Sequence, residues 1–81
     1  MQRFGEKLRT LRKQHNLTMR ELADKIGLST HGYIGDLESG RRQPSLELAV
    51  QIADLFGVTV DQLARDELEV EVSSDRKPTQ L

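Results

Sequence analysis

The cationic residues in the first half of the chain are the ones whose type and spacing could do chemistry. Arg20 opens a short amphipathic segment, and Arg41 and Arg42 lie in the basic loop GRRQP at positions 40–44. Guanidinium groups bind phosphate oxygens through paired N–H donors, and free amides at a helix start bind the same oxygens. These residues therefore favour binding of a phosphate-bearing partner.

The distribution of charge along the chain supports this interpretation. Residues 1–44 carry nine Lys and Arg against five Asp and Glu, a net charge of +4. Residues 45–81 carry three basic and eight acidic residues, a net charge of −5. Such asymmetry between halves indicates a polyanion partner for the basic half.

Several other kinds of chemistry are excluded by what the sequence lacks. Cysteine is absent from the 81 residues, and the two histidines, His15 and His31, are too few for a conventional zinc site. The chain contains no nucleophile elbow or P-loop, and no apolar run approaches the roughly 20 residues that span a bilayer. We therefore expect one small domain without catalysis, cofactor, metal or membrane contact. Because no leader precedes it, we expect the protein to be cytoplasmic.

Apolar residues recur at helical spacing and predict an all-α fold of five short helices. Phe4, Leu8 and Leu11 form the stripe of the first helix. Two capping-box patterns, TMRE at 18–21 and TVDQ at 59–62, open the second and fifth helices. Ser45 caps a fourth helix that ends at Gly57. The predicted core stripe of the fourth helix is Leu46, Ala49, Ile52, Ala53 and Phe56.

The third helix, over residues 30–39, is the weakest in its own packing. It begins at Ser29 or Thr30 and turns only Ile34 and Leu37 inward. Its two internal glycines each cost roughly 1 kcal/mol of helix propensity. Two short helices joined by a tight glycine-containing turn, here 18–26 and 30–39, describe a helix-turn-helix. In that motif the first helix lies on the sugar-phosphate backbone and the second in the major groove.

The sequence resembles the Xre-type, Cro-like helix-turn-helix family over roughly residues 4–65. The resemblance is carried by LTMRELADKIGLS (17–29), YI (33–34), LESGRRQPSL (37–46), ADLFGV (53–58) and DQL (61–63). It implies a five-helix domain over residues 1–65 that binds double-stranded operator DNA, commonly as a symmetric dimer, and regulates transcription. Residues 66–81 are then an acidic extension.

The chain departs from the family pattern by one extra residue between Gly27 and Glu38, which we place near 29–30. Taking Glu38 as the anchor, the resemblance implies these DNA-contacting residues: Met19, Arg20, Thr30, His31, Gly32, Tyr33, Gly35, Asp36, Arg41 and Arg42. Because glycines have no side chain to bond bases, readout would depend on the remaining side chains, close backbone approach or DNA shape. The resemblance also implies a structural ion pair between Arg12 and Glu38.

These residues also have non-functional interpretations. Arg20 could simply pair with Asp24 one turn later, and Arg41 and Arg42 could compensate the acids at 36 and 38. Met19 could cover the turn, and Tyr33 could pack against the second helix.

Leu48 and Leu55 lie beside the predicted core stripe of the fourth helix and are surplus to it. Together with Val60, Val70 and Val72 they form the predicted self-association surface. The alternative is packing against the C-terminal segment of the same chain. Dimerisation would set two reading helices about 34 Å apart, which is the repeat of successive major grooves.

Residues 66–72 alternate apolar with acidic side chains, which fits a strand, while an extension of the fifth helix or disorder are the alternatives. Residues 73–81 are polar and expected to be mobile. A segment of this kind also allows a second function class. An antitoxin-type or restriction-controller protein would bind a partner protein through residues 66–81 as well as its own promoter.

Overall fold

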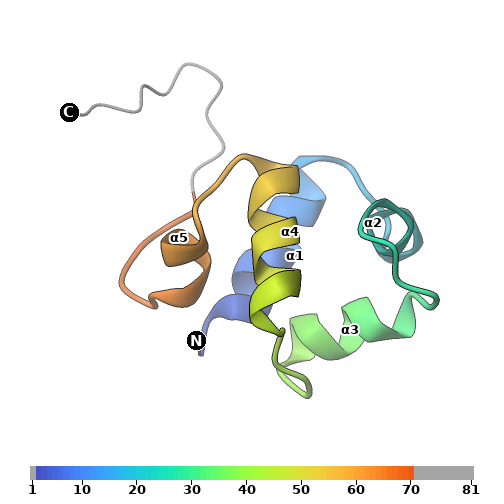
Figure 1. The fold of residues 1–81 in the computed structure, drawn as a ribbon, viewed down its shortest axis with the longest axis horizontal. Coiled ribbons are helices and arrows are strands. Elements are labelled where there is room, and N and C mark those ends of the chain that lie inside the picture. Colours follow the sequence, from blue (N-terminus) through green and yellow to red (C-terminus); the bar gives the residue numbers. More distant parts are fainter. Residues whose placement is uncertain (1, 71–81) are drawn as a thin grey trace.

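The computed structural model describes residues 2–70, and all regular structure in that range is helical (Figure 1). The helices are α1 (Phe4–Gln14), α2 (Met19–Lys25), α3 (Gly32–Ser39), α4 (Leu46–Phe56) and α5 (Val60–Ala64). In Figure 1, α1 and α4 occupy the centre, with α2 and α3 to one side and α5 to the other. The predicted all-α, five-helix fold is confirmed.

The predicted helix starts hold because side chains satisfy the free amides of each first turn. The Thr18 hydroxyl accepts from the Glu21 amide at 3.0 Å, and the Glu21 carboxylate accepts from the Thr18 amide at 2.8 Å. Thr59 and Gln62 form the second capping box, and Ser45 Oγ accepts from the amide three residues on at 3.1 Å. Each predicted start of α2, α4 and α5 is thereby confirmed.

The core draws apolar side chains from all five helices. Its nearly inaccessible members include Phe4, Leu8, Leu11, Leu22, Ile34, Leu37, Ile52 and Leu63. Burying each large aliphatic or aromatic side chain contributes about 1.5–3 kcal/mol, so the short α2 and α3 stand through packing rather than propensity.

The register of α4 corrects two sequence predictions. Leu46, predicted inside, is 74% exposed, whereas Leu48, predicted as surplus and interfacial, is 6% exposed. Leu48 belongs to the same core against which Leu28, from the turn between α2 and α3, and Tyr33, from α3, are packed. A helical wheel of α4 alone does not show which neighbour covers the side that carries Leu48.

Residues 65–70, which we call the strap, fold back onto the domain. They form a turn and loop, so neither the predicted strand nor an extension of α5 is present up to residue 70. Val70 is 9% exposed within the core of its own chain and therefore does not provide a free dimer surface. The packed domain thus extends past residue 65. Val72 of the predicted self-association surface and the tail 73–81, predicted to be mobile, lie outside the described residues.

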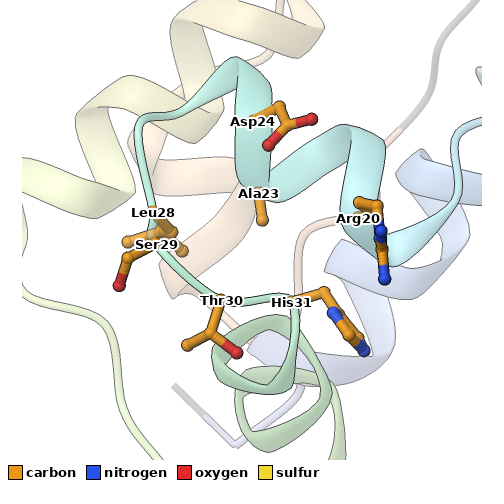
Figure 2. Close-up of a pocket in the computed structure, with 7 residues that line it drawn as sticks. All are labelled: Arg20, Ala23, Asp24, Leu28, Ser29, Thr30 and His31. Atoms are coloured by element: carbon orange, nitrogen blue, oxygen red, sulfur yellow. The ribbon is translucent and has the colours of Figure 1, made fainter.

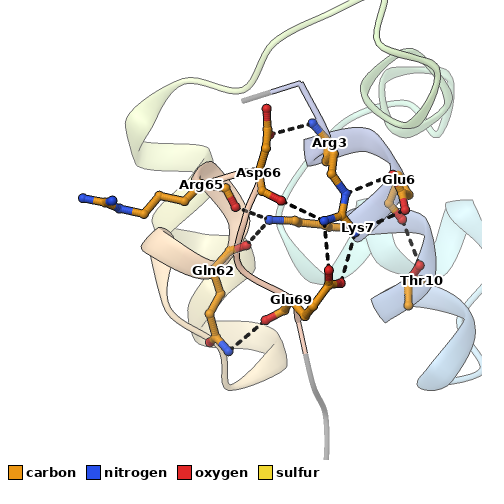
Figure 3. Close-up of polar contacts among 8 residues, drawn as sticks. All are labelled: Arg3, Glu6, Lys7, Thr10, Gln62, Arg65, Asp66 and Glu69. Carbon is orange, nitrogen blue, oxygen red and sulfur yellow. Dashed lines mark hydrogen bonds and ion pairs between the residues drawn. The ribbon is translucent and has the colours of Figure 1, made fainter.

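Two basic side chains of the N-terminal half hold the strap (Figure 3). Lys7, 1% exposed, donates from Nζ to the carbonyls of Gln62 at 2.6 Å and Arg65 at 2.5 Å. The Arg3 guanidinium donates to the Asp66 carbonyl at 2.8 Å and to both carboxylate oxygens of Glu69 at 3.1 Å. These cations are committed to the fold rather than to an external anion.

Candidate nucleic-acid interface

The helices α2 and α3 are joined by a turn that ends α2 and redirects the chain. Gly27 takes the left-handed conformation, with φ +77°, and the Leu28 amide donates to the Ala23 carbonyl at 2.9 Å. Glycine adopts this backbone region without the steric cost that a Cβ atom imposes. Because Leu22 and Ala23 of α2 are buried in the same core as α3, the two helices are held as one unit.

The start of α3 lies slightly later than the sequence predicted. The helix begins at Gly32, preceded by His31 in helical conformation, and Thr30 lies outside it. Thr30 Oγ1 accepts from the Gly32 amide at 3.1 Å, a bond spanning two residues. Threonine makes such a local turn readily, and this turn replaces the predicted N-cap.

The outward face of α3 follows from its buried face. Ile34 and Leu37 point into the core, and the Glu38 side chain is 5% exposed. At 100° per residue, the opposite face consists of Gly32, Asp36 and Ser39. Ser39 is missing from the DNA-contacting residues predicted from the sequence. The inward positions of Ile34 and Leu37 already place Ser39 on the outward face.

Gly35 and Met19 face each other rather than the outside. A Cβ at Gly35 would lie 3.8 Å from Met19 Sδ, and Met19 is half-buried against the core. Met19 therefore covers the joint between α2 and α3, which was its alternative interpretation. Gly35 lies on the flank of α3 next to α2.

Tyr33 lies on the other flank of α3 and supports a cation. Its ring packs against the core, and the Arg42 guanidinium carbon lies 4.5 Å from the ring centroid. The amides of Arg41 and Arg42 both donate to the Asp36 carbonyl, at 3.0 and 3.2 Å. The basic loop is thereby fixed around the end of α3.

Arg12 and Glu38 form the ion pair that the sequence suggested. Arg12 Nε and Nη2 donate to the two Glu38 carboxylate oxygens at 2.6 and 3.2 Å, and Nη1 donates to the Leu17 carbonyl at 2.9 Å. The bond to Glu38 raises the pKa of the Arg12 guanidinium above its ordinary value. One side chain of α1 therefore ties the loop before α2 to the last turn of α3.

Gly5 is a positioning residue that the sequence analysis missed. A Cβ at Gly5 would lie 2.5 Å from the carbonyl oxygens of Leu37 and Glu38, closer than real Cβ contacts. The end of α3 can thus rest directly on α1. The sequence signal was a glycine beside Phe4 in an otherwise regular first helix.

An open polar hollow of about 310 Å³ lies where α2 meets the start of α3 (Figure 2). Arg20 extends from the first turn of α2, and His31 lies at the start of α3. Arg20 and Asp24 form no ion pair in the described part of the chain, so the predicted internal pairing does not occur. This leaves the Arg20 cation available at the hollow.

Fewer cations are available on the surface than the nine basic residues of positions 1–44 suggest. Among residues 1–44, the side chains of Arg3, Lys7 and Arg12 bond within the domain. Six exposed cations have no ion-pair partner within residues 2–70, namely Arg9, Lys13, Arg20, Lys25, Arg41 and Arg42. Arg41 and Arg42 therefore do not neutralise the acids at 36 and 38.

Two further features of residues 2–70 bear on the alternatives. No helix in that range has both the length and the apolar character to cross a membrane. No group of three or more His, Asp or Glu side chains that could hold a metal ion occurs there either.

A family model and several related proteins all assign the chain to helix-turn-helix proteins. The helix-turn-helix family model matches residues 8–63. The chain is 43% identical over 60 residues to the Bacillus subtilis HTH-type transcriptional regulator YobD, covering 74% of this chain and 53% of YobD. It is 44% identical over 57 residues to the Methanocaldococcus jannaschii regulator MJ0272, covering 70% and 85% of the two chains. It is 33% identical over 63 residues to the immunity repressor of Bacillus phage phi105, covering 78% and 43%.

The chain therefore spans about half the length of some of these relatives, and the match covers α2, the turn and α3 in full. The capping box of α2, the glycine turn and the Arg12–Glu38 pair all lie inside the matched region. On these grounds the chain belongs to the Xre-type, Cro-like helix-turn-helix family.

Proposed function

We propose that this protein is a sequence-specific regulator of transcription that binds double-stranded DNA with α3 in the major groove. One observation carries the proposal: the exposed face of α3 lies beside Arg20 at its start and is followed by Arg41 and Arg42 at its end, none of them paired within residues 2–70. Phosphates on either side of a groove would meet those cations. Transcriptional regulators among the relatives support the same function.

Within this proposal the predicted residues divide into two groups. Arg20, Arg41 and Arg42 contact phosphates and set the position of the protein on the duplex. His31, Gly32 and Asp36 lie toward the bases, with Ser39 joining them. Thr30, Tyr33, Gly35 and Met19 support the reading helix from its flanks. The proposal includes no catalytic residue or cofactor and a cytoplasmic location.

Selection from randomised duplexes, followed by fluorescence anisotropy on the selected sequence, tests the proposal. Arg41→Ala should lower the affinity for selected and unselected duplexes alike, by roughly five- to tenfold, because it removes a phosphate contact. Arg65→Ala is the matched control, because the exposed Arg65 guanidinium is already paired with acids of its own chain. Its Nε lies 3.9 Å from Asp61 Oδ1 and its Nη1 lies 3.5 Å from Glu67 Oε2. A wild-type protein that binds no duplex at low salt would refute the proposal.

We further propose a homodimer that reads a palindromic operator. Of the predicted interface, Leu55 and Val60 remain partly exposed around the α4–α5 turn, whereas Leu48 and Val70 are buried in their own chain. Leu46 and Val50, 74% and 41% exposed, form a second apolar pair one turn apart on α4. Sedimentation of Val60→Asp and Val50→Asp variants would show which pair associates; two variants that both behave as the wild type would exclude both surfaces.

Binding of a partner protein is the weaker alternative. Arg3 bonds Asp66 and Glu69 of the strap, and Lys7 bonds the Arg65 carbonyl. A partner would be left with the exposed Glu67 and Leu68, or with the part of 66–81 beyond residue 70, outside the described residues. We therefore favour the DNA-binding function alone.

A further inference from the structure

Asp36 is half-buried and is the single acidic side chain on the outward face of α3, which also carries Gly32 and Ser39. Its carboxylate accepts no hydrogen bond and forms no ion pair within residues 2–70. Ser39 Oγ donates to the backbone carbonyl of Asp36 at 3.2 Å and leaves the carboxylate alone. The neighbouring acid, Glu38, is neutralised by Arg12. An isolated acceptor therefore stands where the groove would lie.

The bases offer few donors to such a group. A carboxylate only accepts hydrogen bonds, and the major-groove donors are the amino groups of cytosine and adenine. Adenine carries the N7 acceptor next to its amino group, which repels a second acceptor, whereas cytosine carries none on its own edge. Guanine and thymine present only acceptors and a methyl group.

We infer that Asp36 selects a cytosine in each half-site by accepting from its N4 amino group. The inference rests on the proposed function, because it requires α3 to enter the groove. Apart from its chain neighbours and the backbone of its own helix, the Cβ position of Gly32, one turn before Asp36, has Thr30 Oγ1 as its one neighbour within 4 Å, at 3.6 Å. With no side chain at that point, the helix can approach the base edges closely enough for a short side chain to reach.

The same charge disfavours the wrong sites. Phosphates and the acceptor-rich edges of other base pairs repel a carboxylate, so Asp36 weakens binding to duplexes that lack the cytosine. Removing the charge should therefore raise affinity for unselected DNA while lowering discrimination. This is the opposite sign to the effect of Arg41→Ala, which weakens binding everywhere.

Randomised-duplex selection with the wild type, Asp36→Asn and Asp36→Ala tests the inference. The wild type should return one cytosine per half-site, and replacing that base should weaken binding roughly tenfold or more. Asp36→Asn should move the preference at that position to adenine, which asparagine bonds at N6 and N7. Asp36→Ala should lose the preference there and keep the others. Asp54→Asn removes an exposed carboxylate on α4 and should leave every base preference unchanged.

The outcomes distinguish a failure of DNA binding from a failure of the role of Asp36. Absence of binding by the wild type to any duplex would refute the DNA-binding function itself. A selected wild-type site whose base preferences stay the same in Asp36→Asn and Asp36→Ala would overturn the role of Asp36 while leaving DNA binding intact. Urea unfolding of each variant checks that the domain is folded in every arm.

Discussion

The Arg12 side chain joins three segments of the chain: α1, which carries it, the loop before α2 and the last turn of α3. It bonds both oxygens of Glu38 and the carbonyl of Leu17, with side chains of the pair 11% and 5% exposed. Removing one partner of such a nearly buried pair leaves a charge and an acceptor without compensation.

Arg12→Ala is expected to lower the free energy of unfolding by about 3 kcal/mol, since Glu38 would remain buried without a counter-charge. Urea denaturation with an unchanged slope would measure this. Arg9→Ala is the matched control on the exposed side of α1 and should stay within about 0.5 kcal/mol. Equal effects of the two substitutions would show that the ion pair contributes no more than a surface arginine.

At the scale of elements, the contact between α1 and the end of α3 decides where α3 lies. Gly5→Ala places a methyl group against backbone oxygens that cannot rotate away. We expect a loss of about 1–3 kcal/mol of unfolding free energy and weaker DNA binding, because α3 must shift.

Gly32→Ala is the comparison for Gly5→Ala, because the new methyl group would make only an ordinary contact, 3.6 Å from Thr30 Oγ1, outside its own helix backbone and chain neighbours. It should raise the unfolding free energy by about 0.5 kcal/mol through the unfolded chain, yet weaken DNA binding by crowding the groove. Thermal denaturation measures the effect on stability, and fluorescence anisotropy on the same protein sample measures the effect on DNA binding. Unimpaired DNA binding by Gly32→Ala would contradict close approach of α3.

The strap gives the domain an acid-sensitive element. The Arg3 amide lowers the pKa of Asp66, and the Arg3 guanidinium lowers the pKa of Glu69, because both favour the ionised carboxylate. A pKa that is lower in the folded state stabilises the fold above the ordinary values, here 3.8 and 4.5. That stabilisation is lost as the pH falls through the folded values.

Carboxyl chemical shifts followed by NMR from pH 7 downward should therefore place the midpoints of Asp66 and Glu69 below their ordinary values. In Arg3→Gln the midpoint of Glu69 should return toward its ordinary value, while Asp66 keeps the backbone donor and stays low. Ordinary midpoints for both groups in the wild type would mean that the strap is not held by Arg3.

At the scale of the whole molecule, the salt dependence of DNA binding should follow the cations that remain outside the fold. If Arg20, Arg41 and Arg42 each meet a phosphate, log affinity against log salt has a slope of roughly −3 per half-site. Anisotropy over a series of salt concentrations measures it, and Arg41→Ala should reduce the slope by about one. A flat dependence would exclude phosphate contacts as the source of affinity.

The sequence predicted the fold well because its helices are marked locally, by apolar spacing and by the caps at Thr18, Ser45 and Thr59. The wrong predictions concern side chains whose burial or bonding depends on segments far away in the sequence. Leu48 is buried in a core that includes side chains of the other helices, and Lys7 bonds carbonyls 55 and 58 residues away. The outward face of α3 could be predicted from the sequence, because the apolar residues of the helix define its inward face. That Asp36 forms no ion pair within residues 2–70 could be established only from the positions of the surrounding side chains.

Arg3 bonds Glu69 across 66 positions of sequence, so the beginning and end of the packed domain adjoin each other. Such proximity suits circular permutation, because a short linker could join residues 2 and 70 with little disturbance. New ends opened in the turn between α4 and α5 would leave α2, α3 and the basic loop continuous.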